Sequence, residues 1–101
     1  MNAYVLEEFA RGDLDDIWDF IAKDNIDAAD RWIARLLDTF ESIAAMPNAG
    51  HKREDLTMRD VLFWSAGAYV IIYDAARSPV EILAITQGAR DIPALLRRRL
   101  P

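Results

Sequence analysis

The chain has 101 residues, a formal net charge of −5 and a pI of about 4.7. Hydrophobic residues make up 52% of the sequence, which is enough for the core of one domain spanning residues 1–101. The acidic balance disfavours a general nucleic-acid binder, because such proteins carry a basic face and a high pI.

No apolar run approaches the ~20 residues that cross a bilayer, so no membrane partner is expected. The N-terminus lacks the basic segment of a signal peptide, and the absence of cysteine fits a cytoplasmic protein. With a single histidine, His51, neither a metal site nor another cofactor is expected. Residues 1–46 hold eleven acidic and four basic side chains, whereas residues 47–101 hold six acidic and eight basic ones. A local basic patch is therefore an option in the second half.

The first part of the chain predicts a short strand and then a helix. The strand covers about residues 3–9 and ends before Gly12. Asp13 fits the N-cap of the helix, with two more aspartates in the first turn facing the positive end of the helix dipole. We interpret this acidic run as a helix start with a solvated face rather than as a metal cluster. The apolar residues that follow recur at helical spacing, at Leu14, Ile17, Trp18, Ile21 and Ala22.

A second helix follows after a short polar link, capped by Asn25 or Asp27. Its apolar stripe consists of Ala29, Trp32, Ile33, Leu36, Phe40, Ile43 and Ala44. It ends at Met46, because the residue before Pro47 is pushed away from helical geometry. The short link makes the two helices an antiparallel hairpin over residues 13–46. The side chains expected in the core between the layers are Trp18, Trp32, Leu36 and Phe40.

The second half of the chain predicts strands, because β-branched and aromatic residues dominate three segments. These segments are residues 59–64, 68–74 and 80–86. Short turns join them, so they form an antiparallel meander over residues 58–87. A final short helix has Asp91 as its cap and Pro93 in its first turn. The order β-α-α-β-β-β-α indicates an α+β domain, with the helix hairpin packed on an antiparallel sheet.

Arg90 is the main candidate for a functional side chain. It follows the third strand of the meander and Gly88, so its side chain is expected at the rim of the sheet. Its guanidinium is a permanent cation whose planar fork suits a carboxylate or a phosphate. The alternative is a structural ion pair with Asp91 or with an acidic residue of the helix hairpin.

Two further features suggest contact surfaces. Phe63 and Trp64 point to opposite sides of the sheet, so one of them faces away from the helix hairpin. An aromatic side chain exposed there would mark a partner surface. Arg97, Arg98 and Arg99 form a basic tail, which either solubilises the end of the chain or docks to a partner. His51 has no nucleophile nearby in sequence and is interpreted as a surface histidine.

Several segments together resemble the ParE/RelE superfamily of toxins from bacterial type II toxin–antitoxin systems. The resemblance covers nearly the whole chain and is carried by "DLDDIWDFIA", the "MPNAG" loop, "YVIIYD" and "GARDIP". It implies a helix hairpin on an antiparallel sheet, in agreement with the periodicity. It also implies a cognate antitoxin as protein partner and a hetero-oligomeric toxin–antitoxin complex.

The superfamily implies two functions of different classes. RelE-like members are ribosome-dependent mRNA endonucleases, whereas ParE-like members poison DNA gyrase. The nuclease relatives carry two lysines, an arginine and a tyrosine where this chain has Val61, Phe63, Val70 and Leu96. Many relatives also carry a histidine where this chain has Gln87. Of the catalytic side chains of the nuclease relatives, this chain therefore keeps only an arginine, Arg90. A lone arginine supplies neither a general base nor a general acid.

The resemblance therefore favours the ParE-like branch: a non-enzymatic gyrase inhibitor without catalytic residues or metal, and without direct contact to nucleic acid. A RelE-like endonuclease that uses Arg90 and an inactive module that only binds its antitoxin remain the alternatives. The antitoxin segment is expected to lie along the helix hairpin or to add to a sheet edge. Candidate contacts to the antitoxin or the target are Arg53, Arg59, Trp64, Arg90, Arg97 and Arg98.

Overall fold

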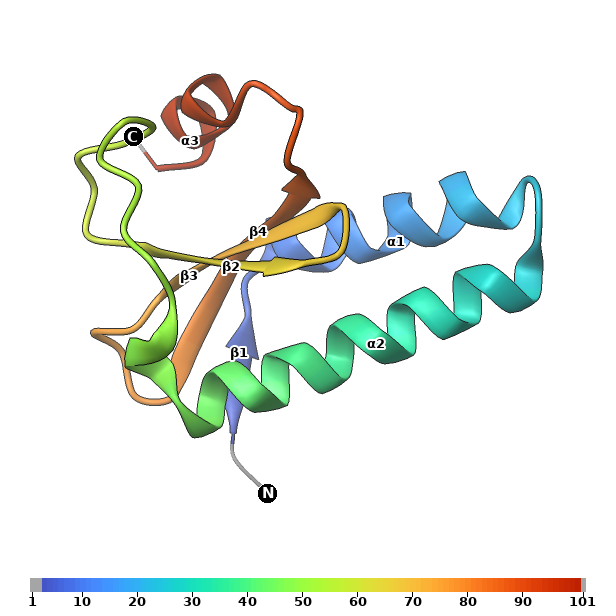
Figure 1. Cartoon of the computed structure of the whole chain (residues 1–101), viewed down its shortest axis with the longest axis horizontal. Coiled ribbons are helices and arrows are strands. Elements are labelled where there is room, and N and C mark those ends of the chain that lie inside the picture. The colour runs from blue at the N-terminus through green and yellow to red at the C-terminus, as the bar shows by residue number, and fades with distance from the viewer. Residues whose placement is uncertain (1–2, 101) are drawn as a thin grey trace.

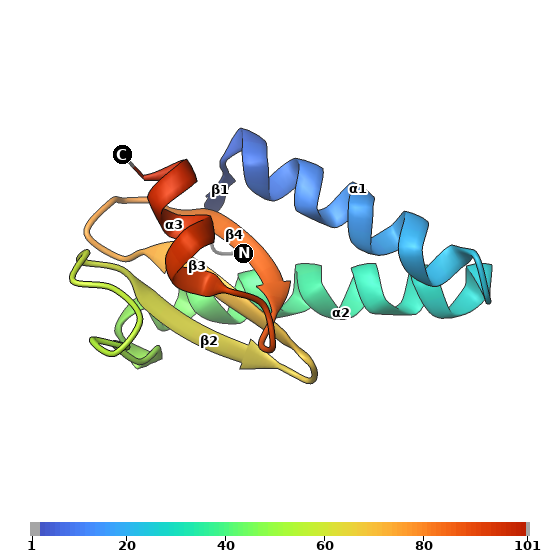
Figure 2. The same cartoon turned by 90° about the horizontal axis from the view of Figure 1, so that it is seen from above.

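The computed structural model describes residues 3–100 as an α+β fold with the predicted order of elements. The elements are β1 (Tyr4–Leu6), α1 (Glu8–Ala22), α2 (Ile26–Ala45), the short 3₁₀ helix η1 (Pro47–Ala49), β2 (Leu62–Ala66), β3 (Tyr69–Asp74), β4 (Val80–Gln87) and α3 (Ile92–Arg99). The α1–α2 hairpin packs on one face of the sheet (Figures 1 and 2), and α3 packs on the other. The sheet is therefore the middle layer of three.

The sheet has four strands in the order β1-β4-β3-β2. The three strands of the meander are antiparallel, as predicted. The sheet as a whole is mixed, because β1 lies parallel to β4 with Tyr4 opposite Val80. The last residue of β1, Leu6, lies opposite Ile82. The part of β4 after Ile82 therefore has no strand on the β1 side.

The prediction that Asp13 caps α1 is wrong, since the helix begins at Glu8. The side chain of Glu7 caps it by accepting a hydrogen bond from the backbone N–H of Phe9 at 2.8 Å. The backbone N–H of Glu7 still donates to the carbonyl of Ile82 at 3.0 Å, so the chain passes directly from the sheet into the helix. Asp13 therefore lies within the helix on its buried side. The start of α2 agrees with the sequence, because Asn25 caps it.

The core between the hairpin and the sheet contains Leu36 and Phe40, both fully buried as predicted. Trp18 and Trp32 were predicted there too, but both are only half-buried. Trp18 lies in the last two turns of α1 and Trp32 in the first two turns of α2, near the link between the helices, and this end of the hairpin extends beyond the sheet (Figure 1). Trp18 donates its indole N–H to Asp30 across the hairpin at 2.9 Å.

Trp32 forms the outer boundary of the core at the turn between β2 and β3. Its ring packs edge-on against Tyr69, with ring centroids 5.1 Å apart. Gly67 in the turn has a φ of +61°, and a Cβ there would lie 2.7 Å from the Trp32 ring. Glycine is required at this position for both reasons. Trp32 thus positions the tip of the β2–β3 hairpin.

Phe40 is fully buried and Trp32 only half-buried, so truncating them should lower the free energy of unfolding by different amounts. Phe40→Ala should lower the free energy of unfolding by about 3–5 kcal/mol, because it leaves a closed cavity. Trp32→Ala should cost clearly less, because water already reaches part of this side chain. Urea titrations of the two variants measure the difference, and a larger loss for Trp32→Ala would contradict this packing.

Candidate interaction site

Helix α3 covers the sheet face opposite the helix hairpin. It begins at Asp91, whose side chain accepts a hydrogen bond from the N–H of Ala94 at 3.1 Å, with Pro93 in the first turn, as predicted. Its apolar side chains form a second core cluster together with residues of the sheet and of the loop before β2. The buried members of this cluster are Val61, Phe63, Ile72, Leu83, Ala84, Ile92, Leu95 and Leu96.

This cluster contains the positions at which nuclease relatives are expected to carry lysine, arginine and tyrosine side chains. Val61, Phe63 and Leu96 are at most 6% exposed, and Val70 packs against the same cluster. The prediction of an exposed aromatic on this face is wrong, because α3 covers Phe63. Trp64 points to the other side and packs, half-buried, against the core under the hairpin. This face of the sheet is therefore a packed core.

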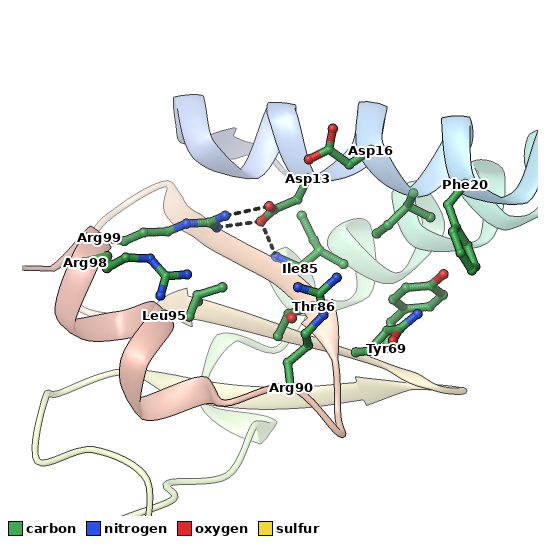
Figure 3. Close-up of a pocket in the computed structure, with 12 residues that line it drawn as sticks. Asp13, Asp16, Phe20, Tyr69, Ile85, Thr86, Arg90, Leu95, Arg98 and Arg99 are labelled. Carbon is green, nitrogen blue, oxygen red and sulfur yellow. Dashed lines mark hydrogen bonds and ion pairs between the residues drawn. The ribbon is translucent and has the colours of Figure 1, made fainter.

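An ion pair joins α3 to α1 (Figure 3). The guanidinium of Arg99 donates two hydrogen bonds to the carboxylate of Asp13, at 2.6 and 2.7 Å. The same carboxylate accepts a third hydrogen bond from the backbone N–H of Ile85 in β4, at 2.9 Å. The Asp13 side chain is only 10% exposed and that of Arg99 19%. We call this arrangement the Asp13–Arg99 clasp.

The clasp satisfies a carboxylate that burial alone would strongly destabilise. Arg99 is a permanent cation, as every arginine is, and its hydrogen bonds to Asp13 raise its pKa further above the ordinary value. Neither residue was a sequence candidate for this contact, although Asp13 lies in register with the buried Ala10 and Ile17. That register becomes visible only once the helix is known to begin at Glu8.

A cavity of about 490 Å³ opens beside the clasp, between α1, the end of β4 and α3. Its lining consists of Asp13, Asp16, Ile17, Phe20, Tyr69, Ile85, Thr86, Gln87, Arg90, Leu95, Arg98 and Arg99. The side chains of Arg90 and Arg98 point toward the space between α1 and α3 (Figure 3). Within residues 3–100, Arg90 forms no ion pair with Asp91 or with the hairpin. We call this space the Arg90 cavity.

The remaining arginine candidates lie elsewhere. Arg53 is exposed and donates two hydrogen bonds to Asp55, at 2.8 and 2.9 Å, which lower the pKa of that carboxyl. Arg59 and Arg97 line a smaller hollow of about 320 Å³ between the loop before β2 and α3. The predicted site residues therefore do not form one site. Arg90 and Arg98 line one cavity, and Arg59 and Arg97 line another.

Within residues 3–100, no three His, Cys, Asp or Glu side chains gather in a way that could hold a metal ion. None of the helices in that range combines the length and the apolar character needed to span a bilayer. His51 is exposed, and its backbone forms an isolated bridge to Phe63.

Comparisons with known proteins agree with the fold. A family model described as "ParE toxin of type II toxin-antitoxin system, parDE" matches residues 4–92. No curated protein matches the chain. Among solved structures, a chain of the "Chromosomal ParDE TA system from P. aeruginosa" is similar with a TM-score of 0.71 and 17% identity. The match covers 86% of this chain and 96% of that chain, and at this identity it supports the fold alone.

The clasp predicts a large stability cost for one arginine of the tail and not for its neighbours. Arg99→Ala should lower the free energy of unfolding by about 3 kcal/mol, because Asp13 then keeps a buried charge without its cation. Arg97→Ala, an exposed change in the same helix, should stay within about 0.5 kcal/mol. Urea titration measures both, and equal losses for the two variants would contradict the clasp.

Proposed function

The chain belongs to the ParE toxin family of type II toxin–antitoxin systems, and from this premise we propose that it inhibits DNA gyrase by direct binding. We further propose that a cognate antitoxin neutralises it by covering the surface that the toxin presents to gyrase. The action is stoichiometric inhibition rather than catalysis, and it needs no metal or other cofactor.

The covered face of the sheet carries this proposal. Cleavage of RNA without a metal needs charged groups at the scissile phosphate and a base for the ribose hydroxyl. At the corresponding positions this chain has the buried apolar side chains of Val61, Phe63 and Leu96. A substrate could reach them only if α3 moved away, and it would then meet no charge. Arg90 lies at the rim of the sheet, where it can serve docking.

Exposed apolar side chains support a protein partner. Several large hydrophobic residues remain in solvent on β1, the helix hairpin and the loops: Val5, Phe9, Phe20, Ile26, Leu37, Met46 and Met58. An amphipathic segment of an antitoxin could cover those of the hairpin, and an extended segment could pair with a free sheet edge. Arg90 and Arg98 line the cavity that includes Phe20, and Arg59 and Arg97 line the hollow that includes Met58, so these four arginines are proposed as cationic contacts. Arg53 would contact a partner only by exchanging its bond to Asp55.

Two assays on one preparation of the protein distinguish inhibition of gyrase from cleavage of mRNA. Supercoiling by purified gyrase should be inhibited, with inhibition that saturates near equimolar toxin. Primer extension on ribosome-bound message should show no new cleavage, because the loss of each proton-transfer or charge-stabilising group costs roughly 10²–10³-fold in rate. Codon-positioned cleavage with unaffected gyrase would establish the endonuclease, and no effect in either assay would establish an inactive binding module.

Neutralisation is tested in growing cells. Expression of the chain alone should stop growth, and coexpression of the small reading frame beside its gene should restore growth. The restored cells should yield a complex of the two proteins on purification. Normal growth during expression of the folded chain alone, with no partner captured from the native host, would contradict the proposal.

A further inference from the structure

We propose that the Arg90 cavity is the subsite for one acidic side chain of a partner peptide, held beside an apolar side chain of the same peptide. The inference rests on the proposed function in one respect, because it takes the cognate antitoxin as the source of the peptide. The guanidinium groups of Arg90 and Arg98 bind the carboxylate, and the apolar wall of the cavity receives the neighbouring side chain.

The charges around the cavity match a single carboxylate. Three arginines and two aspartates line it, so the lining carries one net positive charge. Arg99 is already neutralised by Asp13 in the clasp. Arg90 and Arg98 form no ion pair within residues 3–100, although Asp16 lies across the cavity from them (Figure 3). Arg90 and Arg98 both line this space, and the planar fork of a guanidinium suits a carboxylate.

The same charges disfavour a nucleic-acid backbone as the occupant. A nucleic acid brings one negative charge with every phosphate, and affinity for it comes from many basic contacts. This chain has a net charge of −5, and two aspartates of α1, Asp13 and Asp16, line the cavity. One net positive charge in such surroundings compensates one anionic group and repels the next. A peptide with one acidic side chain among apolar residues fits this distribution.

The apolar side of the cavity supplies the second element of recognition. Ile17, Phe20 and Tyr69 form part of its lining beyond Arg90. The labelled side chains of Phe20 and Tyr69 lie on one side of Arg90, and that of Arg98 lies on the other (Figure 3). Phe20 is 62% exposed, so it has apolar surface left to bury. An apolar side chain placed next to the bound carboxylate would cover this surface.

The end of β4 favours a peptide over a small free acid. Residues of β4 after Ile82 have no strand neighbour on the β1 side. The N–H of Ile85 on this side is already bonded to Asp13. Main-chain groups alternate in direction along a strand, so the next residue whose main chain faces this side is Gln87, which lines the cavity. A strand end without a neighbour offers main-chain hydrogen bonds to an extended peptide. A free carboxylic acid could use the arginines but not this edge.

The test titrates the full-length toxin with defined probes and follows the side-chain N–H signals of its arginines by NMR. The first probe is the capped peptide acetyl-Ile-Glu-Phe-Ile-amide, and its matched control has glutamine in place of glutamate. The glutamate peptide should shift the Arg90 and Arg98 signals and bind about tenfold more tightly than the glutamine peptide. Equal affinity for the two peptides, or shifts confined to other arginines, would overturn the proposal.

Two further probes distinguish the sources of the anion. The free acid 3-phenylpropionate should shift the same signals at least about tenfold more weakly than the peptide, because it lacks a main chain. Inorganic phosphate should leave the signals unshifted at the concentration at which the glutamate peptide saturates the cavity. Binding of the free acid as tight as that of the peptide, or saturation by phosphate, would overturn the assignment to a peptide.

Variants connect the cavity to the antitoxin. Arg90→Ala and Arg98→Ala should each lower the affinity for the glutamate peptide and for the purified cognate antitoxin about tenfold. Arg11→Ala, an exposed arginine of α1 outside the cavity lining, should change neither affinity. Circular dichroism confirms that each variant is folded before it is titrated. If Arg90→Ala binds the antitoxin like the wild type, the subsite is wrong and the proposed function stands. If the wild type binds no antitoxin, the proposed function fails and the peptide titration still decides the subsite.

Discussion

The buried carboxylate of Asp13 is the contact on which the arrangement of this molecule depends. It joins α1, the end of β4 and the last turn of α3 through three charge-assisted hydrogen bonds. Helix α3 has only eight residues, and helices of that length are not stable alone in water. Its position therefore depends on the apolar cluster beneath it and on the clasp. Without α3, the sheet face under it would be an exposed apolar surface.

The clasp also determines which arginines remain for binding. In the sequence, the three arginines of the basic tail look equivalent, but each has a different environment in the structure. Arg99 neutralises Asp13, Arg98 lines the Arg90 cavity, and Arg97 lies on the other side of α3 beside Arg59. One short helix thus covers the face where nuclease relatives carry their chemistry and offers cationic side chains at its two sides. The proposed action by binding makes use of this division.

Local signals in the sequence were sufficient for the class and the order of elements. The first strand, predicted over residues 3–9, ends at Leu6, because the chain passes into α1 at Glu8, and the strand predicted over residues 59–64 spans Leu62–Ala66. The switch from helical to alternating periodicity located the hairpin and the meander, and Asn25 and Asp91 cap their helices as predicted. The start of α1 was missed, because an aspartate after Gly12 is a strong local cap signal. The competing cap at Glu7 depends on a backbone bond to Ile82, which no local pattern contains. The pairing of Asp13 with Arg99, 86 residues away, was hidden for the same reason.

The proposed action by binding requires that the sheet face under α3 stays a packed core in the native protein. Native-state hydrogen exchange of the amides of α3 and β3 measures whether it does. The amides of Leu95 and Leu96 should exchange only through global unfolding, with the same free energy as the β3 core. Exchange of α3 through a low-energy local opening, while β3 stays protected, would contradict it. The face that carries Val61 and Phe63 would then be transiently open to a substrate.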